Sequence, residues 1–230
     1  SVPRELPDLL YELQTALGGA LALVTGRQVS AADRLMAPQS FIVSGVHGTQ
    51  LRGAPAAEAL GLAPRVPAEL VRVVRGVAGG SDAIVVEHKR SGLAVHFRKA
   101  PAAGVALNVE LTRLLERWPQ YELRGGRMVL EIVPRGYSKA TAVNALMQNL
   151  PFRGRVPVAI GDDHGDDPAL VLARKMGGLG LTVGGELFDV TRAAFAIAPA
   201  VRAWLRELLA VLNTDPKVAK APMSWAGELG

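Results

Sequence analysis

Residues 156–167 read Val-Pro-Val-Ala-Ile-Gly-Asp-Asp-His-Gly-Asp-Asp, an apolar run that passes directly into an acidic loop. The apolar part, 156–160, predicts a short buried strand. Four carboxylates follow within the six residues 162–167, and like charges this close repel unless a cation lies among them. In open α/β sheets, ligands bind just outside the carboxyl ends of the strands, which is where this loop falls.

The acidic loop predicts a Mg²⁺ site, because this ion prefers one or two carboxylates, several waters and a substrate phosphate. Asp162 and Asp163 are the candidate ligands. Asp166 or Asp167, followed by Pro168, has instead the pattern of a helix N-cap. The alternative is that the whole loop is only a solvated turn. A cap leaves Asp162 and Asp163 unexplained, and this favours the metal site.

Composition limits the class of protein. The chain has 230 residues, 49% of them hydrophobic, which is enough for one large domain or two small ones. It has no cysteine, no apolar run of the roughly 18–20 residues that span a membrane, and no signal-peptide pattern. The net charge is +5, but the basic residues are scattered and aromatics make up only 5%. We therefore expect a cytoplasmic protein whose partner is a small anionic molecule, not nucleic acid or a membrane.

An alternation of strands and helices predicts an α/β fold with a doubly wound, Rossmann-like core. Ser30 and Ser138 are the expected N-caps of two of its helices. The core is expected to comprise residues 1–76 and 135–214, followed by a poorly ordered tail at 215–230. The expected strands are 20–24, 41–44, 156–160 and 179–183, and the expected helices are 6–17, 30–36, 138–150, 168–176 and 196–212.

The middle of the chain, 77–134, predicts a different, antiparallel α+β domain inserted into the core. Two hairpins are expected, around the turns 90–92 and 124–126. A helix at 108–118 lies between the hairpins, and a helix at 67–77 precedes the insert. The expected strands are 83–89, 93–98, 121–123 and 128–133.

Three strand exits bring polar groups to one edge of the predicted core sheet. The first offers Thr25 and Arg27 just before a helix N-terminus, which favours phosphate; the alternative is an ordinary strand-to-helix turn. The second offers Lys139 in the first turn of a helix, where the macrodipole disfavours a cation. Either an anion compensates this lysine, or its side chain extends into water. Together with the acidic loop, these groups match the needs of phosphoryl transfer.

The inserted domain carries polar residues at alternating strand positions, which share a face of the sheet. Such alternation is typical of a solvated sheet face. A face with both acceptors and donors also suits the hydroxyl groups of a sugar. The residues are Glu87, Lys89, His96, Arg98 and Glu131.

These segments together resemble the trehalose-6-phosphate phosphatases of the haloacid dehalogenase superfamily. In the core, the stretches 24–27, 45–48, 136–142 and 161–167 are similar to that family's hydroxyl-bearing phosphate motif, Gly-x-His-Gly segment, lysine helix and metal loop. In the insert, 86–89, 95–98 and 126–131 resemble strands of the family's cap domain. The likeness extends from residue 2 to about residue 212.

The resemblance implies an α/β core with a mobile cap, and Mg²⁺-dependent hydrolysis of trehalose 6-phosphate to trehalose and phosphate. It assigns the phosphate to Thr25 and Lys139, and the metal to Asp162 and Asp163, with Asp163 also counted as catalytic. An alternative substrate is another sugar phosphate. The residues expected to contact the substrate are Arg27, His47, Glu87, Lys89, His96, Arg98 and Glu131.

One departure from the family pattern affects the chemistry. The family has a first strand ending in Asp-x-Asp-Gly-Thr, with a nucleophile and a general acid/base, and these 230 residues contain no such motif. Three explanations remain open: the strand lies upstream in the same protein, it is held as a separate fragment, or the protein is a non-catalytic relative that binds sugar phosphate or a partner enzyme. We favour the first, because an empty central strand position leaves backbone groups unpaired at about 1–3 kcal/mol each. Residues 1–230 alone are therefore expected to be inactive.

Overall fold

The computed structural model describes residues 2–53, 63–79, 82–185 and 188–214, so the predicted tail at 215–230 lies outside the described residues. The chain divides into two compact units. We call the unit formed by 1–61 and 138–230 the core, and the unit formed by 62–137 the cap. The cap thus begins at residue 62 and not at 77 as the sequence pattern suggested.

The boundary differs because helix α4 (Ala68–Val77), expected in the core, belongs to the cap. Its buried residues Leu70, Val71 and Val74 are part of the cap's hydrophobic cluster. An amphipathic helix is placed by whichever apolar surface it covers, and the sequence pattern shows its apolar stripe but not that surface.

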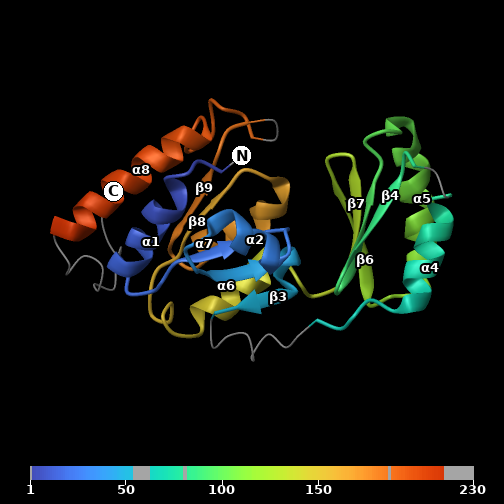
Figure 1. Ribbon diagram of the computed structural model, residues 1–230, viewed down its shortest axis with the longest axis horizontal. Coiled ribbons are helices and arrows are strands. Elements are labelled where there is room, and N and C mark those ends of the chain that lie inside the picture. Colours follow the sequence, from blue (N-terminus) through green and yellow to red (C-terminus); the bar gives the residue numbers. More distant parts are fainter. Residues whose placement is uncertain (1, 54–62, 80–81, 186–187, 215–230) are drawn as a thin grey trace. The chain divides into compact units, whose positions relative to one another are not determined.

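The core alternates helices and strands, as expected (Figure 1). Its elements are α1 (Leu6–Ala16), β1 (Ala22–Val24), α2 (Val29–Met36), β2 (Ile42–Gly45), the 3-10 turn η1 (Val46–Gly48), β3 (Gln50–Arg52), α6 (Lys139–Met147), β8 (Val158–Gly161), the 3-10 turn η3 (His164–Asp166), α7 (Asp167–Lys175), β9 (Leu179–Thr182) and α8 (Ala198–Thr214). Strand β3 is an element that the sequence pattern did not predict.

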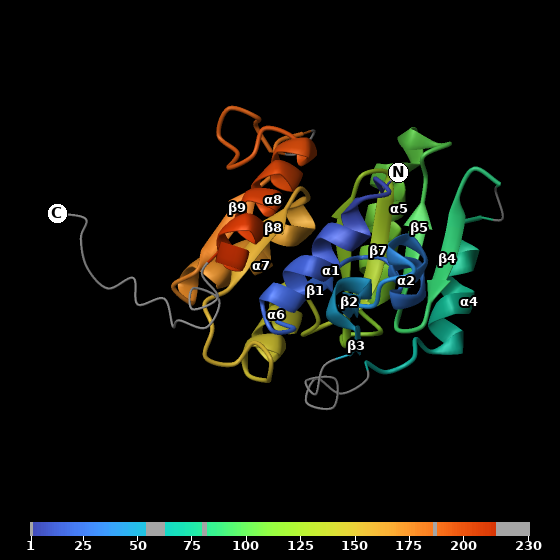
Figure 2. The ribbon, with the colours of Figure 1, turned by 60° about the vertical axis from the view of Figure 1, so that its left-hand side comes forward.

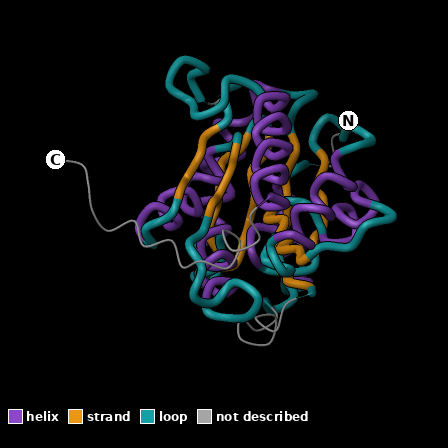
Figure 3. The backbone as a smooth tube through the Cα atoms, turned by 90° about the vertical axis from the view of Figure 1, so that its left-hand side faces the viewer, coloured by secondary structure: helices purple, strands orange, loops and turns teal. Residues whose placement is uncertain are grey.

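The described core strands form two sheets. Strand β1 pairs with β2 in parallel and β3 joins β2 antiparallel, while β8 pairs with β9 in parallel. Figures 2 and 3 show helices packed against these strands. The expectation that the strands at 20–24 and 156–160 are buried is wrong for the described residues: β1 is half-buried throughout and Val158 of β8 is 43% exposed. The reason is that β1 and β8 each pair on one side only within the described chain.

Two predicted helix starts have different outcomes. Ser138 is the N-cap of α6: its hydroxyl accepts the Thr141 N–H at 3.1 Å, and the Ser138 N–H donates to Thr141 Oγ1 at 2.8 Å. Ser30 is not a cap, because α2 begins one residue earlier, at Val29. The Val29 N–H donates to the side-chain oxygen of Gln50 at 3.0 Å, so a residue on β3 satisfies this helix end.

Helices α1 and α8 lie side by side, although they come from the two ends of the described core (Figure 1). Their contact is apolar, formed by Leu9 and Leu13 against Leu209 and Leu212. Burial of such leucine side chains stabilises the unit by about 1.5–3 kcal/mol each. Among the described residues, no helix has the length and apolar character needed to cross a lipid bilayer.

The cap is a four-stranded antiparallel sheet with the strand order β4-β5-β7-β6. Its elements, besides α4, are β4 (Val85–Lys89), β5 (Gly92–His96), the 3-10 turn η2 (Pro101–Ala103), α5 (Gly104–Leu115), β6 (Tyr121–Gly126) and β7 (Val129–Pro134). Both predicted hairpins are confirmed. The turn of the second lies at 127–128, not at 124–126, because β6 continues to Gly126.

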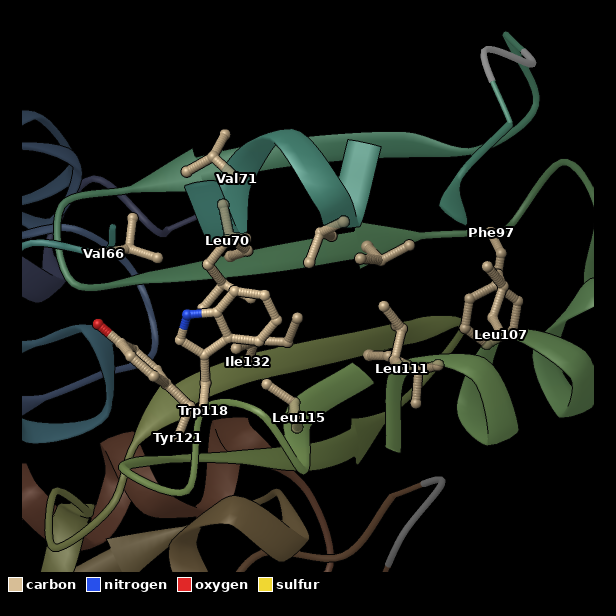
Figure 4. Packing of buried hydrophobic residues seen from close by; sticks show 14 residues of the cluster. Val66, Leu70, Val71, Phe97, Leu107, Leu111, Leu115, Trp118, Tyr121 and Ile132 are labelled. Carbon is tan, nitrogen blue, oxygen red and sulfur yellow. The ribbon is translucent and has the colours of Figure 1, made fainter. Parts of the chain in front are cut away.

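Two helices cover one face of the cap sheet. Figure 4 shows the side chains of Leu111 and Leu115 of α5, with Trp118, packed beside Ile132 of β7. Side chains alternate between the two faces along a strand, so the neighbours of these buried residues in each strand point to the opposite face. The sugar-binding residues predicted on the strands occupy that opposite face.

Candidate active site

The first strand exit is a tight turn at residues 25–27. The Thr25 N–H donates to the Ser44 carbonyl at 2.8 Å, which extends the β1–β2 pairing to the end of the strand. Thr25 Oγ1 accepts the Arg27 N–H at 3.1 Å, and the Arg27 carbonyl accepts the Val46 N–H at 2.9 Å. These bonds fix the Thr25 hydroxyl at the carboxyl end of β1, while the Arg27 side chain is exposed.

The segment after β2 has a left-handed backbone. Val46, His47 and Gly48 have φ angles of 47°, 53° and 93°, and the first two are non-glycine residues for which this region is strained. A Cβ on Gly26 would lie 2.8 Å from His47 Cε1, so the imidazole packs directly against Gly26. A Cβ on Gly48 would lie 2.4 Å from the Ser138 carbonyl oxygen. The loop therefore joins the Thr25 turn to the N-terminus of α6.

Lys139 is buried, and its ammonium pairs with Asp166. The distance from Nζ to Oδ1 is 2.5 Å, and the two side chains are only 10% and 13% exposed. Asp166 supplies the anion that offsets a cation at a helix N-terminus, so the alternative that Lys139 extends into water is wrong. An ammonium has three donors, and this pair uses one of them.

The second oxygen of Asp166 holds the acidic loop. Oδ2 accepts the N–H groups of Asp162 and Asp163 at 3.1 and 3.0 Å. Asp166 stands at the N-cap position of α7, as predicted, but its side chain makes no cap hydrogen bond. Gly161 makes this orientation possible, because a Cβ there would lie 2.4 Å from Asp166 Cβ. Asp166 is thus the functional candidate that the sequence reasoning missed.

These contacts bring the three strand exits together within the core. The Thr25 turn contacts the η1 loop, the η1 loop contacts the start of α6, and Lys139 of α6 contacts Asp166 of the acidic loop. A hydroxyl, an imidazole, an ammonium and two carboxylates therefore lie on connected segments at the carboxyl ends of β1, β2 and β8.

Asp162 and Asp163 are the hard oxygen donors that a divalent cation could use. Both residues are exposed, although Asp163 Oδ1 also accepts the Gly165 N–H at 3.2 Å. Within the described part of the chain, no group of three or more His, Cys, Asp or Glu side chains is placed to enclose a metal ion. Two carboxylates completed by waters and a substrate phosphate are typical of Mg²⁺, whereas Ca²⁺ takes more protein oxygens. The donor set therefore fits Mg²⁺.

In the cap, the sheet register places four residues in one row across the strands: Glu87, Ala94, Glu131 and Arg124. Side chains at paired positions of antiparallel strands point to the same face. This row lies on the face opposite α4 and α5, because Leu93 and Ile132, the next residues along β5 and β7, belong to the cluster under the helices.

Ion pairs organise this face of the cap. Lys89 Nζ lies 2.7 Å from Glu131 Oε1, and these side chains are only 11% and 16% exposed. His96 Nε2 lies 3.0 Å from Glu87 Oε2, at a more exposed position. Arg98 is exposed beyond the end of β5, and no hydrogen bond or ion pair between described residues joins it to this set.

Arg124 belongs to this row, although the sequence pattern predicted that it lies in the hairpin turn at 124–126. Its Nε donates to Glu122 Oε1 at 2.9 Å, and its Nη2 donates to the Tyr137 carbonyl at 2.6 Å. The sequence pattern offered little indication of this role for Arg124, because the glycines at 125 and 126 are typical of a turn although they belong to β6.

Comparison with known proteins adds independent information. A sequence profile of the trehalose-phosphatase family matches residues 1–184. The trehalose-6-phosphate phosphatase of Escherichia coli is 34% identical over 219 residues, covering 92% of this chain and 80% of that protein. A probable trehalose-phosphate phosphatase of Sinorhizobium fredii is 37% identical over 195 residues, covering 80% of this chain and 70% of that protein.

Solved structures show the same fold. A trehalose-6-phosphate phosphatase related protein superposes with a TM-score of 0.64 at 19% identity, covering 95% of this chain and 90% of that one. A haloacid dehalogenase-like hydrolase of Bacteroides thetaiotaomicron superposes with a TM-score of 0.63 at 14% identity, covering 90% of this chain and 93% of that one. At these identities the likeness is one of fold, and it confirms the expected α/β core with an inserted cap.

Proposed function

The chain belongs to the trehalose-phosphatase family, and we propose that it binds trehalose 6-phosphate for Mg²⁺-dependent hydrolysis to trehalose and phosphate. The network around Asp166 is the observation that carries this proposal. It holds a lysine and the two exposed aspartates Asp162 and Asp163 close together in the core, which is the combination that a phosphate ester and its metal ion need.

In this proposal the core binds the phosphate group. Thr25 donates its hydroxyl hydrogen to one phosphate oxygen, and Lys139 directs its remaining ammonium donors to another. Because Lys139 is buried in an ion pair, its charge is held in place before the substrate arrives, which lowers the cost of orienting it. His47 lies beside the Thr25 turn and is the third candidate for a phosphate oxygen.

Asp162 and Asp163 are the residues proposed to hold Mg²⁺, and Asp163 is also the one of the two proposed to be catalytic. When bound, the ion supplies charge neutralisation for the phosphate oxygens. The backbone N–H groups of Asp162 and Asp163 donate to Asp166, which fixes the loop, and both residues are exposed. Asp166 is a positioning residue in this scheme, since its oxygens are occupied by Lys139 and the loop.

The cap is proposed to recognise the sugar. Glu131 and Lys89 offer an acceptor and a donor in fixed geometry, and Glu87 with His96 offers a second such pair. Sugar hydroxyl groups can donate and accept at once, so mixed pairs of this kind suit them. Arg124 extends the row next to Glu131, whereas Arg98 has the weakest support.

These residues bind and position the substrate, but they do not include a nucleophile of the Asp-x-Asp type, because the motif does not occur in the 230 residues. We assign the attack on phosphorus to an aspartate outside them. The one-sided pairing of β1 and β8 among the described residues supports this assignment, since an extended segment can pair with either strand edge.

The test is phosphate release by the full-length gene product. With Mg²⁺ present, trehalose 6-phosphate should be turned over, and excess EDTA should abolish the turnover. A substrate panel with sucrose 6-phosphate, glucose 6-phosphate and an aryl phosphate measures selectivity, and the highest kcat/KM is expected for trehalose 6-phosphate. If none of these esters is turned over, the proposed activity is refuted. Turnover with a higher kcat/KM for another sugar phosphate would refute the substrate while keeping the chemistry.

A further inference from the structure

A cluster of basic residues lies in the cap, on the side of α4. Five basic side chains line one hollow with a volume of about 700 Å³, a size typical of small-molecule sites. Among the described residues, no carboxylate lines it. The basic residues are Arg65, Arg72, Arg75, His88 and Arg90.

This hollow is separate from the proposed sugar-binding face. His88 pairs with Leu93 in the sheet register, and Leu93 is buried in the cluster under the helices. His88 therefore points to the helix side, while its neighbours Glu87 and Lys89 belong to the opposite face. The floor of the hollow is apolar, since Val66 and Val71, both labelled in Figure 4, line it as well.

The arginines of the hollow have no anionic partner in the part of the chain that the structure describes. Within the described residues, none of their side chains makes an ion pair or a hydrogen bond. Arg72 and Arg75 are three residues apart on α4, a spacing at which like charges destabilise a helix. Other arginines of this protein do have carboxylate partners: Arg52 pairs with Asp33, Arg124 with Glu122, and Arg206 with Glu5.

Two further features favour an anion at this place. Ala68, the first residue of α4, lines the hollow, and this helix start has no side-chain cap, so its free N–H groups add positive potential. The acidic residue in the first turn, Glu69, is exposed and does not line the hollow. The excess charge of the chain also resides in the cap: residues 62–137 have 12 basic and 7 acidic residues, and the remainder has 14 of each.

We propose that the hollow bounded by Arg65, Arg72, Arg75 and Arg90 binds a small anion with two or more phosphate groups. Guanidinium groups match phosphate oxygens in bidentate geometry. Several uncompensated arginines favour a multivalent anion, because a single charge would leave most of their mutual repulsion in place. The apolar floor accepts the organic part of such a ligand. This site acts independently of the proposed hydrolysis.

The test uses inorganic pyrophosphate as the probe, by isothermal titration calorimetry on the full-length protein in EDTA at fixed ionic strength. The double variant Arg72→Gln/Arg75→Gln should weaken binding by about tenfold or more, as expected for the loss of two charge-assisted contacts. The matched control is Lys99→Gln/Arg113→Gln, which removes the same charge from exposed cap positions outside the hollow and should change the affinity by less than about threefold. Arg65→Gln/Arg90→Gln, at the two lining arginines outside α4, should repeat the effect if the first variant is unstable.

Equal losses in the test and control variants would overturn the proposal, because they would reduce the effect to net charge. Unchanged affinity in both hollow variants would also overturn it. A hexaglutamate peptide that binds more tightly than pyrophosphate, with the same dependence on Arg72 and Arg75, would replace it with an acidic protein partner. Sulfate at the same ionic strength should bind at least about tenfold more weakly than pyrophosphate, and equal binding would contradict the requirement for two phosphates.

Discussion

Replacing Asp166 with asparagine keeps the size of the side chain and removes its charge. In the native structure one oxygen accepts from Lys139 at 2.5 Å and the other accepts two backbone N–H groups at 3.0 and 3.1 Å. The amide of asparagine has only one oxygen. In either orientation, its NH₂ group faces donors that have lost their acceptor. We therefore expect both a loss of stability and a displaced loop.

The magnitude follows from burial. Both partners of the pair are about nine-tenths buried, and removing one member of such a pair costs about 3–5 kcal/mol. For a chain of this length, about 2–4 °C of thermal midpoint is lost per kcal/mol, so Asp166→Asn should lower the midpoint by at least about 6 °C. Asp167→Asn is the control, because Asp167 is less buried and its carboxylate pairs with the exposed His164 at 3.5 Å; its change should stay within about 0.5 kcal/mol.

Thermal unfolding followed by circular dichroism measures the stability. Phosphate release by the full-length protein at varied Mg²⁺ measures how well the acidic loop binds the ion. Asp166→Asn should raise the Mg²⁺ concentration needed for half-maximal rate, since Asp162 and Asp163 lose the bond that fixes them. Combining Asp166→Asn with Lys139→Met should recover part of the stability, because the buried lysine charge is removed with its partner. A midpoint within about 1 °C of the parent, or strictly additive effects in the double variant, would refute the assigned network.

Three further predictions concern the strained loop, the sugar face and the cap core. Gly48→Ala should cost at least about 2 kcal/mol, because the new Cβ would lie 2.4 Å from the Ser138 carbonyl at a φ of 93°; Gly165→Ala, with nothing within 4 Å of its Cβ, should be near neutral in the same thermal assay. Glu131→Ala should raise KM for trehalose 6-phosphate about tenfold but leave KM for an aryl phosphate nearly unchanged, with Glu110→Ala on α5 as control; equal increases for both esters would remove Glu131 from sugar binding. Burial raises the pKa of Tyr121 above its ordinary value of 10.0, so the neutral phenol is favoured in the folded state and its stabilisation is lost as the pH rises above 10.0. Tyr121→Phe should flatten the fall in urea midpoint above that pH, whereas Tyr11→Phe, at an exposed position, should leave the fall unchanged.

The sequence predicted the individual helices and hairpins of this fold better than it predicted which other elements they pack against. The Ser138 cap, the Lys139 helix and both cap hairpins follow from short-range chemistry, and the structure confirms them. The placement of α4 in the cap and the separation of the core strands into two sheets depend on contacts between distant segments. Neither a helix stripe nor an apolar run specifies the surface that will cover it.

The same distinction holds for the candidate site. A lysine at a helix N-terminus left two alternatives open, an anion nearby or a side chain in water, and the sequence pattern did not show that the anion is Asp166 of the protein itself. The pattern around Pro168 predicted a capping role for Asp166 or Asp167; Asp166 has the N-cap position, but its side chain makes no capping hydrogen bond. The missing fact was three-dimensional: Gly161 leaves the space that lets Asp166 turn toward the loop.

The uneven charge of the two units has a kinetic consequence. A phosphate ester in solution is drawn by electrostatic forces to the unit with the positive surplus, which is the cap, and not to the nearly neutral core. Early encounters of the substrate are then concentrated on the cap. The capture rate should therefore decline as salt shortens the Debye length from about 10 Å at 0.1 M to about 3 Å at 1 M, even where the chemical step is unaffected.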